Sequence, residues 1–330
     1  MKTEAIVFIG VGEVELQTIE MPDPGPGEVQ IRTLYSTISA GTEGWAFRDL
    51  FTWAPTPFPC VPGYQRVGIV AALGPGVEGW RVGDKVMATV GRWAGLVKPF
   101  WGSHLAIANT AATELYRIPD GADDVDVSAT VVAQVGYNAA SRAVLGPGDW
   151  VVVYGDGLIG QSATQAAQAR GARLILVGHR PERLALARQR GAAVVNNREQ
   201  DVAAAVREHT GGRPVVAVLD SVQTEASERE YVPLLERGQG QIVYCGFTPG
   251  ITWADMALLQ QRELTAHYVS GWTRARMEAT LALFAAGRMH LRPLITHLVP
   301  FTEGPAMYRM ILEKSAPFLG ILLDWTGDER

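Results

Sequence analysis

The stretch Trp150-Val-Val-Val-Tyr-Gly155-Asp-Gly157-Leu-Ile-Gly160 decides the fold of this 330-residue chain. An apolar run leads into a G-x-G-x-x-G loop, and an Ala-rich segment with helical character follows it. The first glycine permits a tight turn, the second lets a ligand approach the backbone, and the third lets the helix pack on the strand. Free N–H groups at the start of that helix attract phosphates. We therefore predict that a dinucleotide binds at Gly155, Asp156, Gly157, Leu158, Ile159 and Gly160.

Strand-like and helix-like segments alternate on the carboxyl side of this loop. Regular alternation of this kind predicts a parallel sheet with helices on both faces, which is the doubly wound Rossmann arrangement. The predicted strands are Asp149–Tyr154, Arg173–Val177, Val194–Val195, Val215–Leu219 and Gln241–Cys245, and the predicted helices between the first of them are Gly160–Arg170 and Pro181–Arg190.

The end of the second strand distinguishes NAD from NADP. NAD-selective sites place a carboxylate there, whereas this chain continues with Gly178, His179 and Arg180 and has no acid before Glu182. Gly178 leaves room for a 2′-phosphate, which Arg180 and Arg183 would clamp through contacts worth roughly 1.5–3 kcal/mol each. The alternative is that the arginines only occupy the first turn of the next helix. We predict NADP in preference to NAD, bound by Gly178, His179, Arg180 and Arg183.

The amino-terminal part of the chain has a different residue pattern. Short β-prone runs separated by Gly- and Pro-rich turns predict an antiparallel, barrel-like module. A helical segment follows at Asp123–Val144, and the carboxyl-terminal pattern indicates a helix from Thr273, a loop around Leu291–Val299, another helix, and an apolar run at Phe318–Asp324. That last run should return to the first module as a strand. The predicted domains are therefore 1–127, completed by 273–330, and 128–272.

Composition excludes several classes of protein. The net charge of −5, with no basic tract, argues against a nucleic-acid surface. Two cysteines, Cys60 and Cys245, cannot form a disulfide framework and are expected to be buried thiols. No window is long and apolar enough to span a membrane, and the first residues lack a secretory signal. We expect a cytoplasmic, soluble protein that acts on a small molecule, with no nucleic-acid or membrane partner.

Several motifs occur in a fixed order along the chain. They are Pro22–Val29, Ile38-Ser-Ala-Gly-Thr-Glu43, Val61-Pro-Gly-Tyr-Gln65 with Gly68 and Val70, Val82–Val86, and Pro293–Phe301 followed by Phe318–Asp324. Together with the glycine loop they resemble landmarks of the medium-chain dehydrogenase/reductase superfamily over nearly the whole chain. The resemblance implies a GroES-like β-barrel catalytic domain, a Rossmann cofactor domain and a homodimer joined edge to edge through the Rossmann sheets.

The chain differs from many members of this family at the positions of the zinc ligands. Zinc-dependent members have zinc ligands where this sequence has Ala40, Tyr64 and Val131, and none of these side chains normally binds zinc. The four-cysteine structural lobe is also missing, because Gly91–Ser103 contains no cysteine. We predict no zinc. The motifs at Ser36–Glu43 and Val61–Tyr64 resemble the zinc-free branch that contains bacteriochlorophyllide hydroxyethyl dehydrogenase.

The resemblance also suggests catalytic residues. Thr42 matches the hydroxyl residue that begins the proton relay of zinc enzymes, and its alternative role is to cap a turn. Tyr64 replaces a metal-binding histidine and is either a proton donor or a packing aromatic. Glu43 is a further candidate, although an ion pair with an arginine such as Arg66 is its favoured role, and His104 is expected to be a structural residue at a strand end.

The remaining candidates also follow from the resemblance. Loop aromatics, among them Trp45, Trp53 and Trp101, suit a bulky or flat substrate but would equally suit core packing or a subunit interface. Segments after two later strands, and a third segment at Val269 and Ser270, would approach the ribose and nicotinamide of the cofactor. The residues predicted there are Ser221, Cys245, Gly246, Phe247, Val269 and Ser270.

Three functions agree with these features. The favoured one is a zinc-independent, NADP(H)-dependent oxidoreductase for an alcohol/ketone pair. The second is an enone or quinone reductase of the same fold, in which hydride goes to a β-carbon and no metal is needed. The third is a non-catalytic NADPH-binding protein.

Overall fold

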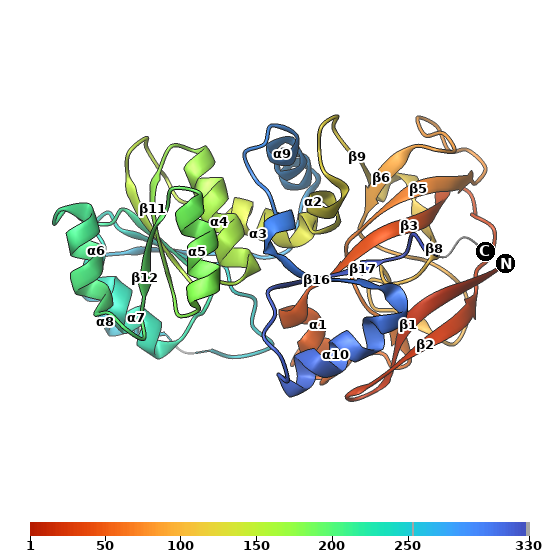
Figure 1. Ribbon diagram of the computed structural model, residues 1–330, viewed down its shortest axis with the longest axis horizontal. Coiled ribbons are helices and arrows are strands. Elements are labelled where there is room, and N and C mark those ends of the chain that lie inside the picture. The colour runs from red at the N-terminus through yellow and green to blue at the C-terminus, as the bar shows by residue number, and fades with distance from the viewer. Residues whose placement is uncertain (253, 328–330) are drawn as a thin grey trace. The chain divides into compact units, whose positions relative to one another are not determined.

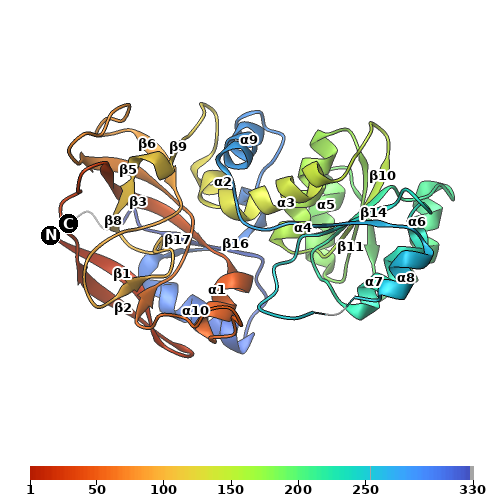
Figure 2. The same ribbon diagram turned by 180° about the vertical axis from the view of Figure 1, so that it is seen from behind.

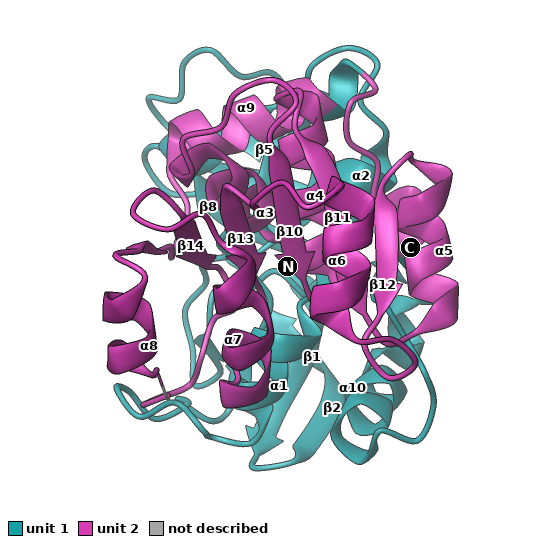
Figure 3. Ribbon diagram, turned by 90° about the vertical axis from the view of Figure 1, so that its left-hand side faces the viewer, with its two compact units in different colours: residues 1–131, 284–286, 295–330 teal, residues 132–283, 287–294 magenta. Residues whose placement is uncertain are grey.

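The computed structural model describes residues 1–252 and 254–327, and the chain divides into two compact units (Figure 3). Unit 1 comprises residues 1–131, 284–286 and 295–330, and unit 2 comprises residues 132–283 and 287–294. Within the described residues, no helix is both long enough and apolar enough to cross a membrane.

Unit 2 contains a six-stranded parallel sheet with the strand order β12-β11-β10-β13-β14-β15. Figures 1 and 2, taken from opposite sides, show helices α4 to α8 flanking this sheet. Its strands are β10 (Trp150–Tyr154), β11 (Arg173–Gly178), β12 (Ala193–Asn196), β13 (Ala217–Asp220), β14 (Gln241–Tyr244) and β15 (Thr265–Tyr268). Its helices are α3 (Thr130–Arg142), α4 (Leu158–Ala169), α5 (Pro181–Gln189), α6 (Val202–Thr210), α7 (Glu225–Tyr231), α8 (Met256–Gln261) and α9 (Arg274–Ala285), with short 3-10 turns η2 (Val232–Leu234) and η3 (Arg292–Leu294).

The sheet of unit 2 follows from the sequence pattern. Val151, Val152 and Val153 of β10 are all buried, as expected for a central strand covered on both faces. Asp201 caps α6 by accepting a hydrogen bond from the Ala204 N–H at 2.7 Å. The alternation predicted from the sequence is therefore present, and the fold class is confirmed.

Unit 1 is built from two β-sheets. One has the order β2-β1-β4-β7, and the other has the order β16-β17-β3-β5-β6-β9, with β8 pairing to β3. Its strands are β1 (Lys2–Gly10), β2 (Glu13–Glu20), β3 (Glu28–Ile38), β4 (Cys60–Val61), β5 (Arg66–Leu73), β6 (Lys85–Ala88), β7 (Lys98–Pro99), β8 (Ile107–Ala111), β9 (Leu115–Arg117), β16 (Ile295–Pro300) and β17 (Gly320–Asp324). Its helices are α1 (Ala40–Phe47), α2 (Asp124–Ser128) and α10 (Gly304–Glu313), with 3-10 turns η1 (Ala112–Glu114) and η4 (Phe301–Glu303).

The last strand returns to the first module, as the sequence predicts. β17 pairs antiparallel with β3, so that Leu323 lies opposite Ser36 in the second sheet. Ile321, Leu322 and Leu323 are buried there, which explains why this run is apolar without a helical period. The chain therefore closes unit 1 with a segment from its carboxyl end.

The structure corrects several boundaries. The predicted loop Leu291–Val299 contains most of β16, whose half-exposed alternating pattern and flanking prolines hide it in the sequence. The predicted helix Asp123–Val144 is two helices, α2 and α3. Residues 273–283 and 287–294 group with unit 2 instead of the catalytic domain. One reason is that the backbone of His290 exchanges two hydrogen bonds with the side chain of Gln165 in α4, at 2.8 and 3.1 Å.

Candidate active and cofactor sites

The glycine loop (Gly155–Gly160) joins β10 to α4. Gly155 has a φ of +111°, and a Cβ there would lie 2.3 Å from the Ser221 hydroxyl. A Cβ on Gly160 would lie 1.8 Å from the carbonyl oxygen of Gly155. These two glycines are therefore required by contacts within the protein.

Gly157 is different, because a Cβ there would have no atom within 4 Å. Its φ of −76° is also open to any residue, so neither packing nor backbone strain explains the glycine. Gly157 is the N-cap of α4, and Leu158 and Ile159 follow in the first turn, where helix N–H groups lack intrahelical acceptors. A ligand that approaches the backbone here accounts for the residue, and the first turn of α4 favours an anionic one.

The predicted cofactor residues that follow β13 and β14 lie beside the glycine loop. Ser221 donates from its hydroxyl to the carbonyl of Tyr154 at 2.9 Å, at the end of β10. A Cβ on Gly246 would lie 2.8 Å from the Ser221 carbonyl oxygen, and the Cys245 thiol donates to the Asp220 carbonyl at 3.2 Å. The structure thus brings the carboxyl ends of three parallel strands together, as expected for a doubly wound sheet.

The other predicted cofactor residues follow the ends of β14 and β15. Phe247 is 40% exposed, directly after Gly246. Val269 is buried and Ser270 is exposed after β15, and the following Gly271 carbonyl accepts a hydrogen bond from Gln134 at 3.0 Å. These residues therefore lie at the carboxyl edge of the sheet.

Asp220, which precedes the predicted cofactor residue Ser221, anchors the turn that carries it. Its carboxylate accepts hydrogen bonds from the Val222 and Gln223 N–H groups and from the Tyr231 hydroxyl. Burial raises the pKa of Asp220, whereas the two N–H groups and the Tyr231 hydroxyl oppose this effect. The residue is structural, and its position at the end of β13 is the only signal that the sequence offers.

The space beside Gly178 is not open, which corrects one prediction. A Cβ on Gly178 would lie 2.5 Å from the Asp156 side chain, so the glycine makes room for that carboxylate and not for a phosphate. Asp156 is only 5% exposed, and its Oδ2 accepts hydrogen bonds from the His179 and Arg180 N–H groups at 2.9 Å each. The glycine loop is thereby tied to the end of β11.

The arginines at this position form a charged group around Asp156. Arg183 Nη1 pairs with Asp156 Oδ1 at 3.3 Å. Burial lowers the pKa of Arg183 and the charge of Arg180 lowers it further, whereas Asp156 opposes both effects. Arg183 thus shares this buried carboxylate with two backbone N–H groups, and the charges of Asp156, Arg180 and Glu182 all act on its guanidinium.

In unit 1 the structure brings together a hydroxyl cluster, which consists of Tyr64, Ser39 and Thr42. The Tyr64 hydroxyl hydrogen-bonds with the side chains of Ser39 and Thr42, which lie at the start of α1. Tyr64 is 7% exposed, and burial followed by the charge of Glu43 raises the pKa of its hydroxyl. Its ring meets Trp101 edge-to-face at 5.2 Å. The phenol therefore stays protonated and can donate a hydrogen bond.

Glu43 lies beside this cluster and forms a buried hydrogen-bond network with His104 and Tyr308, which we call the Glu43 network. Its Oε2 accepts hydrogen bonds from His104 Nε2 at 2.9 Å and from the Tyr308 hydroxyl, and its Oε1 accepts from the Ser39 N–H at 2.8 Å. On its other side, His104 Nδ1 meets the Ser36 hydroxyl at 2.8 Å, to which an indole N–H also donates. Through Ser39, the carboxylate fixes the start of the helix that carries Thr42.

The expected Glu43–Arg66 ion pair is wrong. Arg66 is fully buried and donates instead to the carbonyls of Gly102 and Val90 and to a threonine hydroxyl. Burial lowers the pKa of Arg66 to about 9. The partner of Glu43 is His104, whose ring packs so closely on the backbone that a Cβ on Gly63 would lie 2.5 Å from it.

Tyr308 is the functional residue that sequence reasoning misses in this network. It donates to Glu43 from α10, although 265 residues separate the two in the chain. Its ring is fully buried and lies edge-on to Phe8 at a centroid distance of 4.8 Å. Tyr308 belongs to no motif, so only the closure of unit 1 by the carboxyl-terminal segment reveals its role.

The loop aromatics of unit 1 form a connected series that leads outward from Tyr64. Trp101 contacts Phe100 at 4.3 Å, Phe100 contacts Phe51 at 6.1 Å, and Phe51 contacts Trp53 at 4.6 Å between ring centroids. Trp53 is 57% exposed, so the series runs from the hydroxyl cluster to solvent. Trp101 also adopts a left-handed φ of +69°, a strained conformation for a bulky residue that its packing must hold.

Comparison with known proteins agrees with this description. Residues 25–120 match the family described as alcohol dehydrogenase GroES-like domain, and residues 159–286 match the family described as zinc-binding dehydrogenase. An alcohol dehydrogenase of Cupriavidus necator is 27% identical and aligns over 97% of this chain and 98% of its own length. The chain is an alcohol dehydrogenase-like oxidoreductase.

Two further proteins are similar to this chain over nearly its whole length. The 2-desacetyl-2-hydroxyethyl bacteriochlorophyllide A dehydrogenase of Rhodobacter capsulatus is 28% identical and aligns over 98% of this chain and 99% of its own. The crystal structure of 2R,3R-butanediol dehydrogenase from Bacillus subtilis has a TM-score of 0.84 at 21% identity, with 98% and 99% of the two chains covered. At 21% identity, the likeness to the butanediol dehydrogenase structure shows the fold alone.

The zinc that the second family description implies does not fit the residues of this oxidoreductase. Ala40, Tyr64 and Val131 offer no ligand atom that normally binds zinc in proteins. Both ring nitrogens of His104 are hydrogen-bonded, and burial raises the pKa of the Cys60 thiol to about 12, which disfavours the thiolate that zinc requires. Over residues 1–252 and 254–327, no group of three His, Cys, Asp or Glu side chains is placed to hold a metal ion.

Proposed function

We propose that this protein is a zinc-independent, NADP(H)-dependent oxidoreductase that transfers hydride between the nicotinamide and a bulky alcohol/ketone pair. The observation that carries the proposal is the hydroxyl cluster, because Tyr64 stands where zinc-dependent relatives have a metal-binding histidine and joins Ser39 and Thr42. A protonated phenol can do part of the work of a Lewis acid, since it donates a hydrogen bond to an oxygen that gains negative charge.

The bound dinucleotide would supply the hydride. During reduction, the Tyr64 hydroxyl donates its hydrogen bond to the substrate oxygen and then its proton to the alkoxide. Because burial raises the pKa of Tyr64, the phenolate left behind is a strong base and takes a proton from solvent through the hydroxyls of the partly exposed Ser39 and Thr42. In the oxidation direction the same hydroxyls pass the proton of the alcohol to solvent.

Glu43 acts as a positioning residue in this proposal. It contacts the Ser39 N–H and not the reacting atoms, and its charge disfavours the phenolate form of Tyr64. The His104 imidazole and the Tyr308 hydroxyl hydrogen-bond with the other carboxylate oxygen, so that the buried side chain has its polar partners within the protein.

NADP is favoured over NAD by the charges at the end of β11. The Asp156 carboxylate is committed to two backbone N–H groups and to Arg183, so few of its lone pairs remain for ribose hydroxyls. Arg180 and Arg183 provide two guanidinium groups at this position, where the carboxylates of Asp156 and Glu182 also act on Arg183. A 2′-phosphate would accept charge-assisted hydrogen bonds from these guanidinium groups.

The substrate, subunit arrangement and location belong to the same proposal. The aromatic series from Trp101 to Trp53 suits a bulky, flat or aromatic substrate. β15 is an edge strand of its sheet and carries the 72% exposed side chain of Tyr268, and a homodimer would pair this edge with its own copy. A cytoplasmic location also remains a prediction.

Turnover with defined substrates tests the proposal. The protein is incubated with NADPH or NADH and with separate panels of aromatic ketones, enones and quinones, and oxidation of the dinucleotide is followed by its absorbance. We expect NADPH oxidation with ketones and a lower KM for NADPH than for NADH. Oxidation with enones or quinones alone would refute the alcohol/ketone assignment, and tight NADPH binding without turnover on any panel would indicate a non-catalytic protein.

A further inference from the structure

A cavity lies in unit 2, at the edge of the sheet opposite to the glycine loop. It has a volume of about 290 Å³ and is lined by the end of α6, by the segments that precede β13 and β14, and by Arg262, which precedes β15. All strands of this sheet are parallel, so these segments mark its amino edge, whereas the glycine loop marks its carboxyl edge. The short strands between them separate the two edges by roughly 15 Å.

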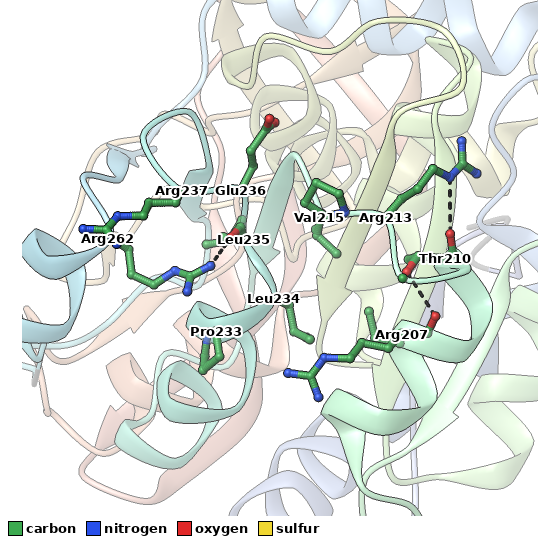
Figure 4. Close-up of a pocket in the computed structure, with 13 residues that line it drawn as sticks. Arg207, Thr210, Arg213, Val215, Pro233, Leu234, Leu235, Glu236, Arg237 and Arg262 are labelled. Atoms are coloured by element: carbon green, nitrogen blue, oxygen red, sulfur yellow. Dashed lines mark hydrogen bonds between the residues drawn. The ribbon is translucent and has the colours of Figure 1, made fainter.

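The charges that line this cavity are unbalanced. Four arginines and one glutamate contribute to it, and no salt bridge in the described part of the chain joins any of these arginines to a carboxylate. Figure 4 shows the guanidinium groups of Arg207 and Arg262 on the side of Pro233 and Leu234, whereas the Glu236 carboxylate points away from them. The one acid of the lining therefore does not neutralise them.

Two of the guanidinium groups are held in place by the backbone. Arg262 donates from Nη2 to the Leu235 carbonyl, and Arg213 donates from Nε to the Thr210 carbonyl at 3.2 Å. Each guanidinium has five N–H donors, so most of them remain available to a ligand. The backbone contacts reduce the entropy that a ligand would lose in ordering these side chains.

The wall between the arginines is apolar. Val215 and Leu235 form an isolated bridge that links the segments before β13 and β14, and together with Val206 and Leu234 they are buried at the base of the cavity. An arginine rim over an apolar wall matches a ligand that carries a phosphate on an apolar body, because guanidinium binds phosphate oxygens in a bidentate way.

We propose that this cavity binds a phosphorylated small molecule, with its phosphate held by Arg207 and Arg262 and its apolar part against Leu234. The site is separate from the dinucleotide site, and the inference does not depend on the proposed reaction. Phenyl phosphate is a suitable probe, and inorganic phosphate is its counterpart without an apolar body.

Isothermal titration calorimetry on the full chain tests the proposal, with the dinucleotide present at saturation so that the glycine loop is occupied. We expect one phenyl phosphate per chain, weaker binding of inorganic phosphate, and loss of affinity as salt is added. Arg207→Glu should weaken phenyl phosphate binding at least about tenfold, since one charge-assisted contact becomes a repulsion. The exposed Arg188→Ala, on α5, should leave binding unchanged.

Arg262→Ala is the second variant and should also weaken phenyl phosphate binding. Because this variant loses the hydrogen bond to the Leu235 carbonyl, it could fail to fold, and Arg207→Glu then still tests the site. The proposal is overturned if phenyl phosphate does not bind in the presence of dinucleotide, or if Arg188→Ala weakens it as much as Arg207→Glu does. Equal affinities for phenyl phosphate and inorganic phosphate would refute the apolar part of the assignment.

Discussion

The glycine loop of unit 2 and the hydroxyl cluster of unit 1 are encoded in different ways. The loop is one continuous segment, and its function depends on backbone geometry that only glycine permits at Gly155 and Gly160. The cluster assembles Tyr64 with Ser39 and Thr42 from two segments, and the network behind it adds His104 and Tyr308 from two more.

This difference explains which features vary within an alcohol dehydrogenase-like fold. A backbone site must keep its glycines, so the loop indicates a dinucleotide in any sequence of this fold. A side-chain site can be altered without changing the surrounding strands, and in the proposed function Tyr64 with the Ser39 and Thr42 hydroxyls takes the place of a metal centre. Changes in unit 1 should therefore alter chemistry, and changes in the loop should alter cofactor binding or folding.

The largest effect is expected for Tyr64→Phe. Loss of the phenol removes both the hydrogen bond to the substrate oxygen and the proton source, so kcat for ketone reduction should fall by about 100- to 1000-fold. The dissociation constant of NADPH, measured by fluorescence titration, should not change. Tyr116→Phe, at a buried tyrosine on β9 of the same unit, is the matched control and should retain activity.

Arg180→Ala tests the charge at the end of β11. Removing one guanidinium should weaken NADPH binding by roughly 10- to 150-fold and leave NADH binding nearly unchanged. Arg188→Ala removes the same charge on the exposed face of α5 and should affect neither. Equal losses for both dinucleotides in Arg180→Ala would show that no 2′-phosphate is bound there.

Two substitutions within the glycine loop separate packing from binding. Gly160→Ala places a Cβ 1.8 Å from the Gly155 carbonyl oxygen and should lower the free energy of unfolding by about 1–3 kcal/mol. Gly157→Ala meets no protein atom within 4 Å and should lower the free energy of unfolding by less than about 1 kcal/mol, the cost of alanine at an N-cap, while weakening dinucleotide binding about tenfold. Denaturant unfolding and titration with NADPH provide the two readouts, and a stable Gly157→Ala variant with full affinity would contradict the proposed ligand approach.

A smaller effect on catalysis is expected for Glu43→Gln. The amide keeps the shape but loses the charge that binds His104 and Tyr308, and the free energy of unfolding should fall by about 1–3 kcal/mol. Because Glu43 positions Ser39 without touching substrate, kcat should fall about tenfold, with KM for the ketone little changed. Glu225→Gln, in an exposed ion pair with Arg229, should change stability by less than about 0.5 kcal/mol.

Much of unit 2 can be predicted from the sequence because its signals are local. The apolar β10 and the glycine loop lie next to each other in the chain, and the buried valines of β10 directly indicate a central strand. The role of Asp156 cannot be predicted, since it depends on the close approach of the loop to Gly178, which no spacing rule describes. The edge strand β15 gives no clear signal because it is short and largely exposed.

In unit 1 the sequence indicates positions but not partners. Tyr64 and Thr42 stand at family motifs, and the structure joins them through hydrogen bonds. The sequence suggests an arginine as the partner of Glu43, whereas in the structure its partners are His104, which follows β7, and Tyr308 of α10. Contacts of such long range are set by sheet closure. α1 itself is hidden in the sequence because its glycines and threonine favour a loop.

The most direct test of the central claim is turnover by metal-depleted protein. The untagged protein is treated with a strong chelator, its zinc content is determined by elemental analysis, and ketone reduction with NADPH is compared before and after treatment. The hydroxyl cluster predicts unchanged kcat in a preparation with far less than one zinc per chain. Stoichiometric zinc whose removal abolishes turnover, and whose return restores it, would contradict the account.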